Sequence, residues 1–295
     1  MRDIEADWMA AMRRGDFPAA WEISDQVLAL RDPATRDDPA LPYHQRWVWD
    51  GRPFAGRHVL VRCYHGLGDT LQFARALPVL RRHAASVTAE VPPELLDLLA
   101  AMPEAPRLLP FIPGRPAPPA ECDLEIMELM HALRLQPGAV PPPYLHASPA
   151  SLPRGAVGLC CQAGGWDPGR SVPPALLAAA LAPAIAGRPV VLLQPAPANP
   201  FPGAVNPGGC PAEISATASL IAGLDLVITV DTMVAHLAGG LGRPVWLLLK
   251  HQADWRWTEG PTCPWYPAAR LFRQAAPGDW TLPLSRIAAA LRQAG

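Results

Sequence analysis

The sequence predicts an α/β protein with two parallel sheets, each covered by helices on both faces. Short apolar runs alternate with helix-like stretches from residue 58 onward, and the alternation pauses once, at the proline-rich residues 137–153, before it restarts. The chain has 295 residues, of which 50% are hydrophobic, so two domains of ordinary size can each bury a core. Short apolar strands that alternate with helices are typical of parallel sheets buried on both sides.

This order of segments is that of two Rossmann-like, doubly wound domains. In open α/β sheets, ligands bind at the carboxyl ends of the strands, so we expect a site in the cleft where the two sets of strand ends face each other. The predicted strands are 58–64, 86–91, 108–112, 156–161, 189–194, 224–230, 244–249 and 269–274, with a further run at 122–129, and the predicted helices are 69–82, 93–101, 173–186, 216–222, 232–241 and 280–293.

The first 50 residues differ from the rest of the chain. Trp8, Met12 and Trp21 recur at helical spacing, with a break between two short helices. A single helical pair cannot bury its own apolar faces, so we expect it to pack on the domain that follows. The predicted domains are a helical, repeat-like extension (1–55), an N-terminal Rossmann-like domain (56–150), a C-terminal Rossmann-like domain (151–275) and a closing helix (276–295).

Composition argues against several classes of protein. Every long stretch of uncharged apolar residues is broken by Pro or Gly before it reaches 18 residues, so we expect no membrane-spanning helix. The acidic N-terminus M-R-D-I-E-A-D-W has no apolar core, so we expect no signal peptide. A net charge of −1 gives no general reason to bind nucleic acid. The six cysteines form no C-x-x-C pair, which favours buried free thiols in a reducing cytosol. No metal-ligand spacing, P-loop or G-x-S-x-G pattern stands out.

The first candidate motif is Y-H-G-L-G-D-T-L-Q-F, residues 64–73, directly after the first predicted strand. Gly66 and Gly68 permit a tight turn and a close approach by a ligand, and Thr70 completes the loop. Asp69 stands where it can either cap the helix or point into the cleft. On spacing alone the cap is the commoner role, because Asp is among the best residues there.

A dinucleotide-binding fingerprint is the alternative interpretation of this motif. G-L-G is present, and Glu90 ends the next strand about 20 residues on, as an acid that binds ribose would. The third glycine position, however, holds Leu71. An NAD-dependent oxidoreductase is therefore the more distant hypothesis.

The second candidate motif is V-D-T-M-V-A-H, where the predicted strand 224–230 becomes a helix. If Asp231 caps that helix, the amides of Thr232, Met233 and Val234 are left to bind an anion such as a diphosphate. His236 follows Thr232 by four residues and shares its helix face. It either touches a ligand or is a satisfied core residue.

Three further side chain types fit an anionic nucleotide. Arg170, in G-G-W-D-P-G-R-S-V-P, is a cation on a glycine-rich loop, and a solvated loop arginine is the equal alternative. Lys250 stands at a strand end and is another phosphate partner. Trp255 and Trp257 either stack on a nucleobase or wall the domain core.

Together these segments resemble the heptosyltransferase-like glycosyltransferases of family 9, which have the GT-B fold. The resemblance is nearest to the branch in which that domain follows tetratricopeptide repeats. It rests on residues 66–75, 170–173, 227–239 and 254–274, which span most of residues 57–275. V-D-T-x-x-A-H-L-A-G together with D-W-R-W is the specific part of the match.

The resemblance implies an inverting, metal-independent transferase without a cofactor, which uses a nucleotide-sugar donor, typically an ADP-linked heptose. It implies that Asp69 is the general base and that Asp231, Thr232 and His236 hold the donor diphosphate. Arg170 falls where related enzymes carry a basic residue for the phosphates. The acceptor domain would then be residues 56–150 and the nucleotide-sugar domain residues 151–275.

The implied acceptor is a glycan or a protein, such as a lipopolysaccharide core or a surface protein, and the implied location is the cytoplasm, with peripheral association at the inner membrane allowed. Two departures stand out: the helical region is far shorter than a repeat array, and the loop before Arg170 is not the usual polar, lysine-bearing one. They motivate the alternative of a non-catalytic nucleotide-sugar-binding or scaffold protein.

Overall fold

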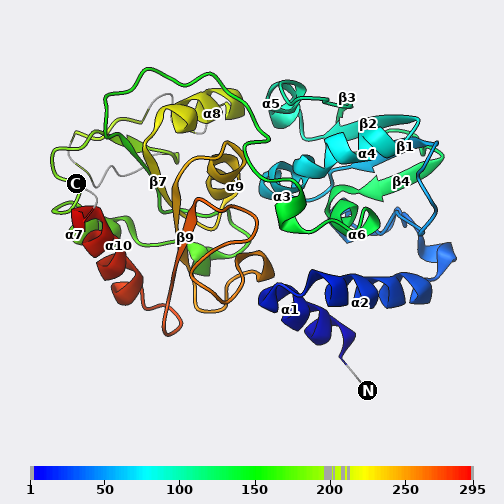
Figure 1. The fold of residues 1–295 in the computed structure, drawn as a ribbon, viewed down its shortest axis with the longest axis horizontal. Helices are drawn as coiled ribbons and strands as arrows, with labels where there is room; N and C mark the ends of the chain where they lie inside the picture. Colours follow the sequence, from blue (N-terminus) through cyan, green and yellow to red (C-terminus); the bar gives the residue numbers. More distant parts are fainter. Residues whose placement is uncertain (1–2, 196–200, 202, 207–209, 211–212, 294–295) are drawn as a thin grey trace. The chain divides into compact units, whose positions relative to one another are not determined.

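The computed structural model describes residues 3–195, 201, 203–206, 210 and 213–293. The chain divides into two compact units, Met1–Leu145 (unit 1) and His146–Gly295 (unit 2), and the division falls inside the proline-rich stretch. Each unit contains one sheet in which every pair of named strands is parallel (Figure 1). The predicted α/β class with parallel sheets is confirmed.

The sheet of unit 1 has the order β3-β2-β1-β4. Because its strands are parallel, their carboxyl ends all lie at one edge, where ligands bind in sheets of this type. His58 pairs with Ser86 and Val59 with Cys122, so the four strands are in close register. The strands are β1 His58–Arg62, β2 Ser86–Val91, β3 Arg107–Pro110 and β4 Cys122–Glu125.

Two elements of unit 1 differ from the sequence prediction. The helix expected at 69–82 begins earlier and is divided by a 3-10 turn at Ala74–Ala76, because Pro78 has no N–H with which to continue the hydrogen-bond ladder. The run 122–129 is a strand only as far as Glu125, after which the chain turns helical. The helices of this sheet are α3 Leu67–Phe73, α4 Leu77–His83, α5 Leu96–Ala100 and α6 Leu129–Ala132.

The N-terminal extension forms two helices, α1 Ile4–Arg14 and α2 Phe17–Leu30, joined at Gly15 in the left-handed conformation. The pair lies against α6 and its flanks (Figure 1). Asp25 of α2 accepts hydrogen bonds from His131 at 2.9 Å and Arg134 at 2.7 Å. The extension therefore packs on the rest of unit 1, as expected for helices that cannot bury their own faces.

The sheet of unit 2 has the order β6-β5-β7-β8-β9. In the figure, α7 and α10 lie together and α8 lies near α9 (Figure 1). The strands are β5 Val157–Cys160, β6 Val190–Leu192, β7 Leu226–Val230, β8 Val245–Leu249 and β9 Ala269–Arg273, and the helices are α7 Pro174–Leu181, α8 Ile214–Gly223, α9 Met233–Gly240 and α10 Thr281–Gln293.

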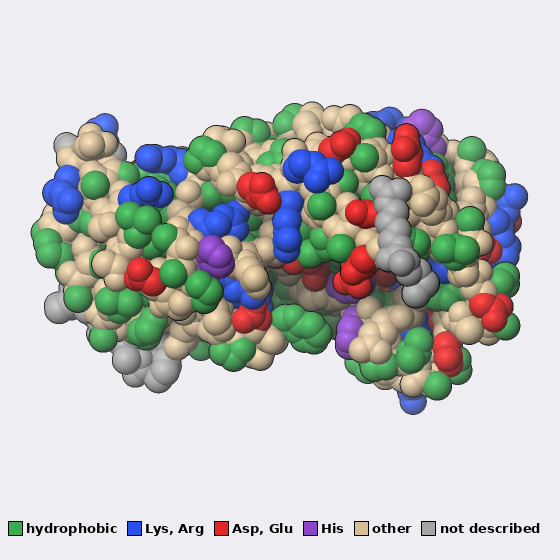
Figure 2. Space-filling model, turned by 90° about the horizontal axis from the view of Figure 1, so that it is seen from below, with side chains coloured by type: hydrophobic (Ala, Val, Ile, Leu, Met, Phe, Trp, Pro, Cys, Tyr) green, Lys and Arg blue, Asp and Glu red, His purple; other side chains and the backbone are tan. Residues whose placement is uncertain are grey.

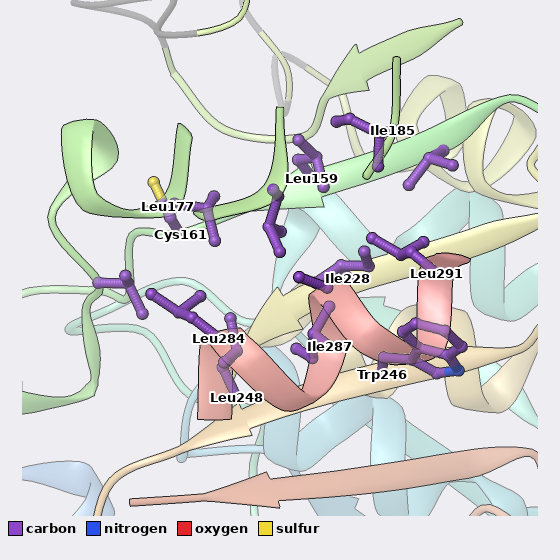
Figure 3. Close-up of a cluster of buried hydrophobic side chains, with 14 of the residues drawn as sticks. Leu159, Cys161, Leu177, Ile185, Ile228, Trp246, Leu248, Leu284, Ile287 and Leu291 are labelled. Atoms are coloured by element: carbon purple, nitrogen blue, oxygen red, sulfur yellow. The ribbon is translucent and has the colours of Figure 1, made fainter. Parts of the chain in front are cut away.

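Helix α10 closes one face of this sheet. Its buried residues Leu284, Ile287 and Leu291 recur at helical spacing and belong to the same cluster as Ile228 of β7 and Leu248 of β8 (Figure 3). Each fully buried Leu or Ile side chain contributes roughly 1.5–3 kcal/mol relative to an exposed one. The closing helix is therefore part of the core of unit 2.

Helix α9 is held close to its surroundings by glycines. A Cβ atom at Gly239 would lie 2.4 Å from the ring of Tyr266, so a larger residue cannot fit without movement. Gly242, with a φ of +70°, provides the left-handed residue that ends the helix. Gly239 therefore allows the close packing of α9, and Gly242 marks its end.

The surface of the protein reflects its net charge of −1. On the face in Figure 2, acidic and basic side chains are interspersed among apolar ones. Among the residues described, no helix is long and apolar enough to cross a membrane, and no group of three or more His, Cys, Asp and Glu is placed to hold a metal ion. All six cysteines are buried free thiols, as predicted.

Candidate functional site

Asp69 lies at the carboxyl edge of the unit 1 sheet, in the first turn of α3. The residue that caps this helix is Gly66, so the prediction of Asp69 as the N-cap is corrected: Asp69 occupies the third helical position, and its carboxylate accepts the Gly66 N–H at 3.1 Å. Gly68 is the second residue of the helix, and Thr70 is buried, with its hydroxyl donating to the Gly66 carbonyl at 3.3 Å. Asp69 itself is half-buried. The turn fixes this carboxylate at the strand ends.

Glu125, at the end of β4, is a second carboxyl group at this edge, and the sequence analysis missed it. It accepts hydrogen bonds from the amides of Tyr64 at 3.3 Å and Met127 at 2.7 Å, and the His65 Nε2 atom lies 3.8 Å from it. Burial raises the pKa of Glu125 well above its ordinary value, and the neighbouring carboxylates of Glu128 and Asp69 raise it further. Interpreting residues 122–129 as one run hid the signal, which is an acid at a strand end.

Glu90, the acid of the dinucleotide hypothesis, is not placed to bind a ribose. It is 1% exposed, its carboxylate accepts the Ala117 N–H at 2.6 Å, and burial raises its pKa. An acid that binds ribose must be accessible and ionised to accept hydrogen bonds from the two ribose hydroxyls. The geometry around β2 therefore gives no support to the oxidoreductase hypothesis.

In unit 2, the N-terminus of α9 follows directly on β7. Thr232 is the N-cap, with an extended backbone and no hydrogen bond from its side chain to the helix. The prediction that Asp231 caps the helix is therefore corrected by one residue. The amides of Met233 and Val234, in the first turn, have no acceptor within the helix. Thr232 and Met233 are half-exposed, so this end of the helix offers donors to an anion.

Arg170 is brought to the same strand end. Its Nη1 donates to the Asp231 carbonyl at 3.1 Å and lies 4.0 Å from the Asp231 carboxylate. Its Nε is buried and has no hydrogen-bond partner among the described residues. Arg170 is thus held beside the first turn of α9, and the alternative of a solvated loop arginine does not apply.

The carboxyl group of Asp231 is unusual in its charge state. Burial and then the Asp254 carboxylate raise its pKa, Arg170 lowers it, and the net result is a pKa of about 6. Asp231 is therefore close to half protonated at mildly acidic pH. An anion at the α9 terminus meets less repulsion from Asp231 when this carboxyl is protonated.

Lys250, the only lysine in the chain, follows β8 and pairs with Asp167 on the loop before Arg170. Its Nζ lies 2.6 Å from the Asp167 carboxylate, and this contact lowers the pKa of Asp167. The other oxygen of Asp167 accepts the Gly169 N–H at 3.0 Å. The predicted phosphate partner thus already holds an anionic group from the chain itself, and Asp167 is a site residue that the sequence analysis did not select.

His236 and the two tryptophans lie in the core of unit 2. His236 is 5% exposed, its Nδ1 is 3.0 Å from the Tyr266 hydroxyl, and its ring stacks on Trp257 with centroids 5.1 Å apart. Trp257 is 1% exposed and Trp255 is 8% exposed. A nucleobase would reach either ring only after rearrangement, so their stacking on a base stays a prediction.

Comparison with known proteins gives one match by sequence and several by structure. No family model matches the chain. An 83-residue segment is 36% identical to Protein FlbA of Caulobacter vibrioides. The matched segment covers 28% of this chain and 13% of FlbA. The chain therefore spans a small part of the length of the curated relative that it matches.

The similar solved structures each match about four fifths of this chain. A family 9 glycosyl transferase from Veillonella parvula has a TM-score of 0.56 at 12% identity over 83% of this chain and 99% of its own. The ADP-heptose lipopolysaccharide heptosyltransferase II of E. coli has a TM-score of 0.57 at 18% identity over 80% and 99%. The E. coli heptosyltransferase WaaC, solved with ADP-2-deoxy-2-fluoro heptose, has a TM-score of 0.54 at 15% identity over 81% and 100%.

The class defined by these observations is an α/β protein of two Rossmann-like units, each with one parallel sheet. More narrowly, the chain has the GT-B fold found in the family 9 glycosyltransferases and heptosyltransferases. The resemblance inferred from the sequence motifs is confirmed at the level of the fold.

Proposed function

We propose that the protein is a glycosyltransferase that moves a sugar from a nucleotide-sugar donor to a hydroxyl group. The donor that best fits the structural neighbours is an ADP-linked heptose, because two of them are named for ADP-heptose or bind its analogue. The acceptor is a glycan or protein hydroxyl, with the lipopolysaccharide core as one candidate. The transfer inverts the anomeric carbon and uses no metal.

The observation that carries this proposal is the N-terminus of α9 beside Arg170, where the cap Thr232 makes no side-chain hydrogen bond to the helix. When the glycosidic bond breaks, the nucleoside diphosphate leaves with the electron pair, and its new charge needs stabilisation. The Met233 and Val234 amides and the Arg170 guanidinium can supply it in place of a metal ion.

Unit 1 supplies the other requirement of the reaction. As the acceptor oxygen bonds to the anomeric carbon, its proton must pass to a base within hydrogen-bond reach. Asp69, half-buried and held by the Gly66 amide, is the carboxylate proposed for this step. Glu125 is less suited, because burial favours its protonated form.

A non-catalytic nucleotide-sugar-binding protein is the second candidate. The Lys250–Asp167 ion pair favours it, because an ion pair that closes on itself weakens the attraction of a diphosphate. Transfer or hydrolysis of ADP-heptose by the purified protein would exclude this candidate.

The single lysine gives a direct test of donor binding. We expect ADP to raise the melting temperature and to slow acetylation of Lys250 by acetic anhydride, because a diphosphate at the α9 terminus lies beside the Lys250 strand end. Peptide mass mapping separates Lys250 from the α-amino group. UDP, GDP and NAD serve as comparison ligands.

The matched variants are Arg170→Ala and Arg286→Ala, the latter on the exposed side of α10. Loss of the ADP effect in the first variant and its retention in the second support the diphosphate site. Stabilisation by NAD alone, or by none of the four nucleotides, would contradict the proposal.

A further inference from the structure

The last part of the N-terminal extension, residues 37–47, runs to the carboxyl edge of the unit 1 sheet. We call it the bridging segment. The Asp37 N–H donates to the Trp47 carbonyl at 2.9 Å, which closes the segment into a loop, and the Asp37 carboxylate lies 3.5 Å from Arg62 at the end of β1. A helical extension that served only to cover α6 would have no need to reach the strand ends.

Aromatic contacts fix the bridging segment in this place. The Tyr43 ring lies 5.2 Å from that of Tyr64, which follows β1, and 4.9 Å from that of Phe111, which follows β3. The Tyr43 hydroxyl also accepts the Gly114 N–H at 2.9 Å. Tyr43 thus ties the extension to the ends of two strands at once, with ring geometries that are favourable for aromatic pairs.

This anchoring places His44 beside His65. The two imidazole centroids are 6.5 Å apart, His44 is exposed, and the His65 side chain is 30% exposed. His65 in turn lies 3.8 Å from Glu125 and directly precedes the turn that holds Asp69. The extension therefore contributes a polar side chain to the same edge as the proposed base.

The charges at this edge indicate what it would bind. The Arg46 guanidinium is occupied by the carbonyls of Leu41 and Pro39 and lies over the Tyr43 ring, and Arg62 is buried in a bond to Asp123. One exposed arginine, Arg115, follows Gly114 on the loop after β3.

Apolar side chains also lie at this edge of the sheet. Phe111 is half-buried against the rings of Tyr43 and Tyr64, and Ile112, the next residue, is 49% exposed, so the loop after β3 presents apolar atoms at this edge. Side chains that combine an apolar body with a few hydroxyl-binding groups suit a sugar ring, which has apolar C–H faces and polar edges.

Resting on the proposed function, we infer that the bridging segment completes the acceptor site and that this site takes an uncharged saccharide, with His44 and His65 binding its hydroxyls. The assignment gives the extension a role in acceptor recognition. It also favours neutral glycans over phosphorylated ones, since two of the three arginines named here are already occupied.

The test uses the full-length protein with saturating ADP on an array of neutral oligosaccharides and their phosphorylated counterparts. We expect binding to neutral members, reduced at least tenfold in both His44→Ala and His65→Ala. His83→Ala is the matched control, because His83 is exposed at the end of α4, where the chain leads to the opposite edge of the sheet.

A preference for phosphorylated glycans that is lost in Arg115→Ala, full binding by His44→Ala, or no binding to any glycan would each overturn the inference. The melting-temperature shift with ADP, measured on the same variants, separates the two proposals. If that shift is intact in the wild type, a negative array result counts against the acceptor site alone.

Discussion

The two strand-end sites have opposite chemical characters. At the edge of unit 1 the groups near the strand ends are the carboxyls of Asp69 and Glu125. His65 lies beside Glu125 and also beside His44 of the bridging segment. At the edge of unit 2 they are Arg170, Lys250 and the amides of a helix N-terminus. One edge carries acidic and imidazole groups, and the other carries cations and amide donors.

The difference comes from how each strand continues into its helix. After β1 the chain places an acid, Asp69, in the first turn of α3, where its carboxylate accepts the N–H of the cap residue Gly66. After β7 the cap Thr232 leaves the first turn of α9 without a side chain partner. The two strand–helix turns thus differ in charge, because the first turn of α3 contains an acid and the first turn of α9 contains none.

The change with the largest expected effect is Asp69→Asn. We expect turnover to fall by about 10²- to 10⁴-fold, the usual range for loss of a general base, while ADP binding stays the same. The amide oxygen of Asn can still accept the Gly66 N–H, so the start of α3 is preserved. Steady-state kinetics and ADP titration measure the two effects. Full turnover would remove Asp69 as the base and erase the contrast between the edges.

Asp231→Asn tests the charge state of the unit 2 edge. Because the pKa of Asp231 is raised to about 6, the stability it contributes is fully present below its ordinary value of 3.8 and is lost as the pH rises through about 6. At 1.36 kcal/mol per pKa unit, the loss is on the order of 3 kcal/mol. We expect the variant to lack this decline in unfolding free energy.

Urea denaturation between pH 4 and pH 7 measures the effect, with Asp97→Asn, exposed on α5, as the control. Parallel curves for Asp231→Asn and the wild type would show that Asp231 does not titrate in this window. The anion-binding edge would then carry a full negative charge beside Arg170.

The smallest expected effect is that of Asp167→Asn on the affinity for ADP. Whether the affinity rises or falls distinguishes two roles of Asp167. Both partners of the Lys250–Asp167 pair are about a third exposed, so the pair is worth roughly 0.2–1 kcal/mol. Releasing Lys250 should therefore tighten ADP binding by at most about fivefold, with less gain at high salt. Calorimetric titration measures it. Weaker binding would mean that Asp167 positions Lys250 and does not compete with the diphosphate.

Much of the fold followed from the apolar runs, because strands buried on both faces of a parallel sheet leave a strong pattern. Short boundary features did not: neither the break at Pro78 nor the turn after Glu125 changes the hydrophobic pattern, because apolar residues continue through both. The cap of α9 was assigned to Asp231 in place of Thr232 because both residues are polar and both types are common helix caps.

The contacts that shape the sites could not be predicted from the sequence, for another reason. The pairing of Lys250 with Asp167 joins residues 83 positions apart, and the contact of His44 with His65 depends on how a loop without periodicity folds back. His236 was correctly narrowed to two roles, but only its bond to Tyr266 and its stacking on Trp257 place it in the core.

The six buried thiols have a further use. Burial raises the pKa of Cys63 and Cys122 in unit 1 and of Cys160, Cys161 and Cys210 in unit 2, so none of these five reacts readily while its surroundings stay closed. Alkylation at native pH therefore proceeds through transient opening. If mass spectrometry assigns each modified cysteine, the alkylation rates of the native cysteines report how often each unit opens. The two units can be followed separately, and no cysteine has to be introduced.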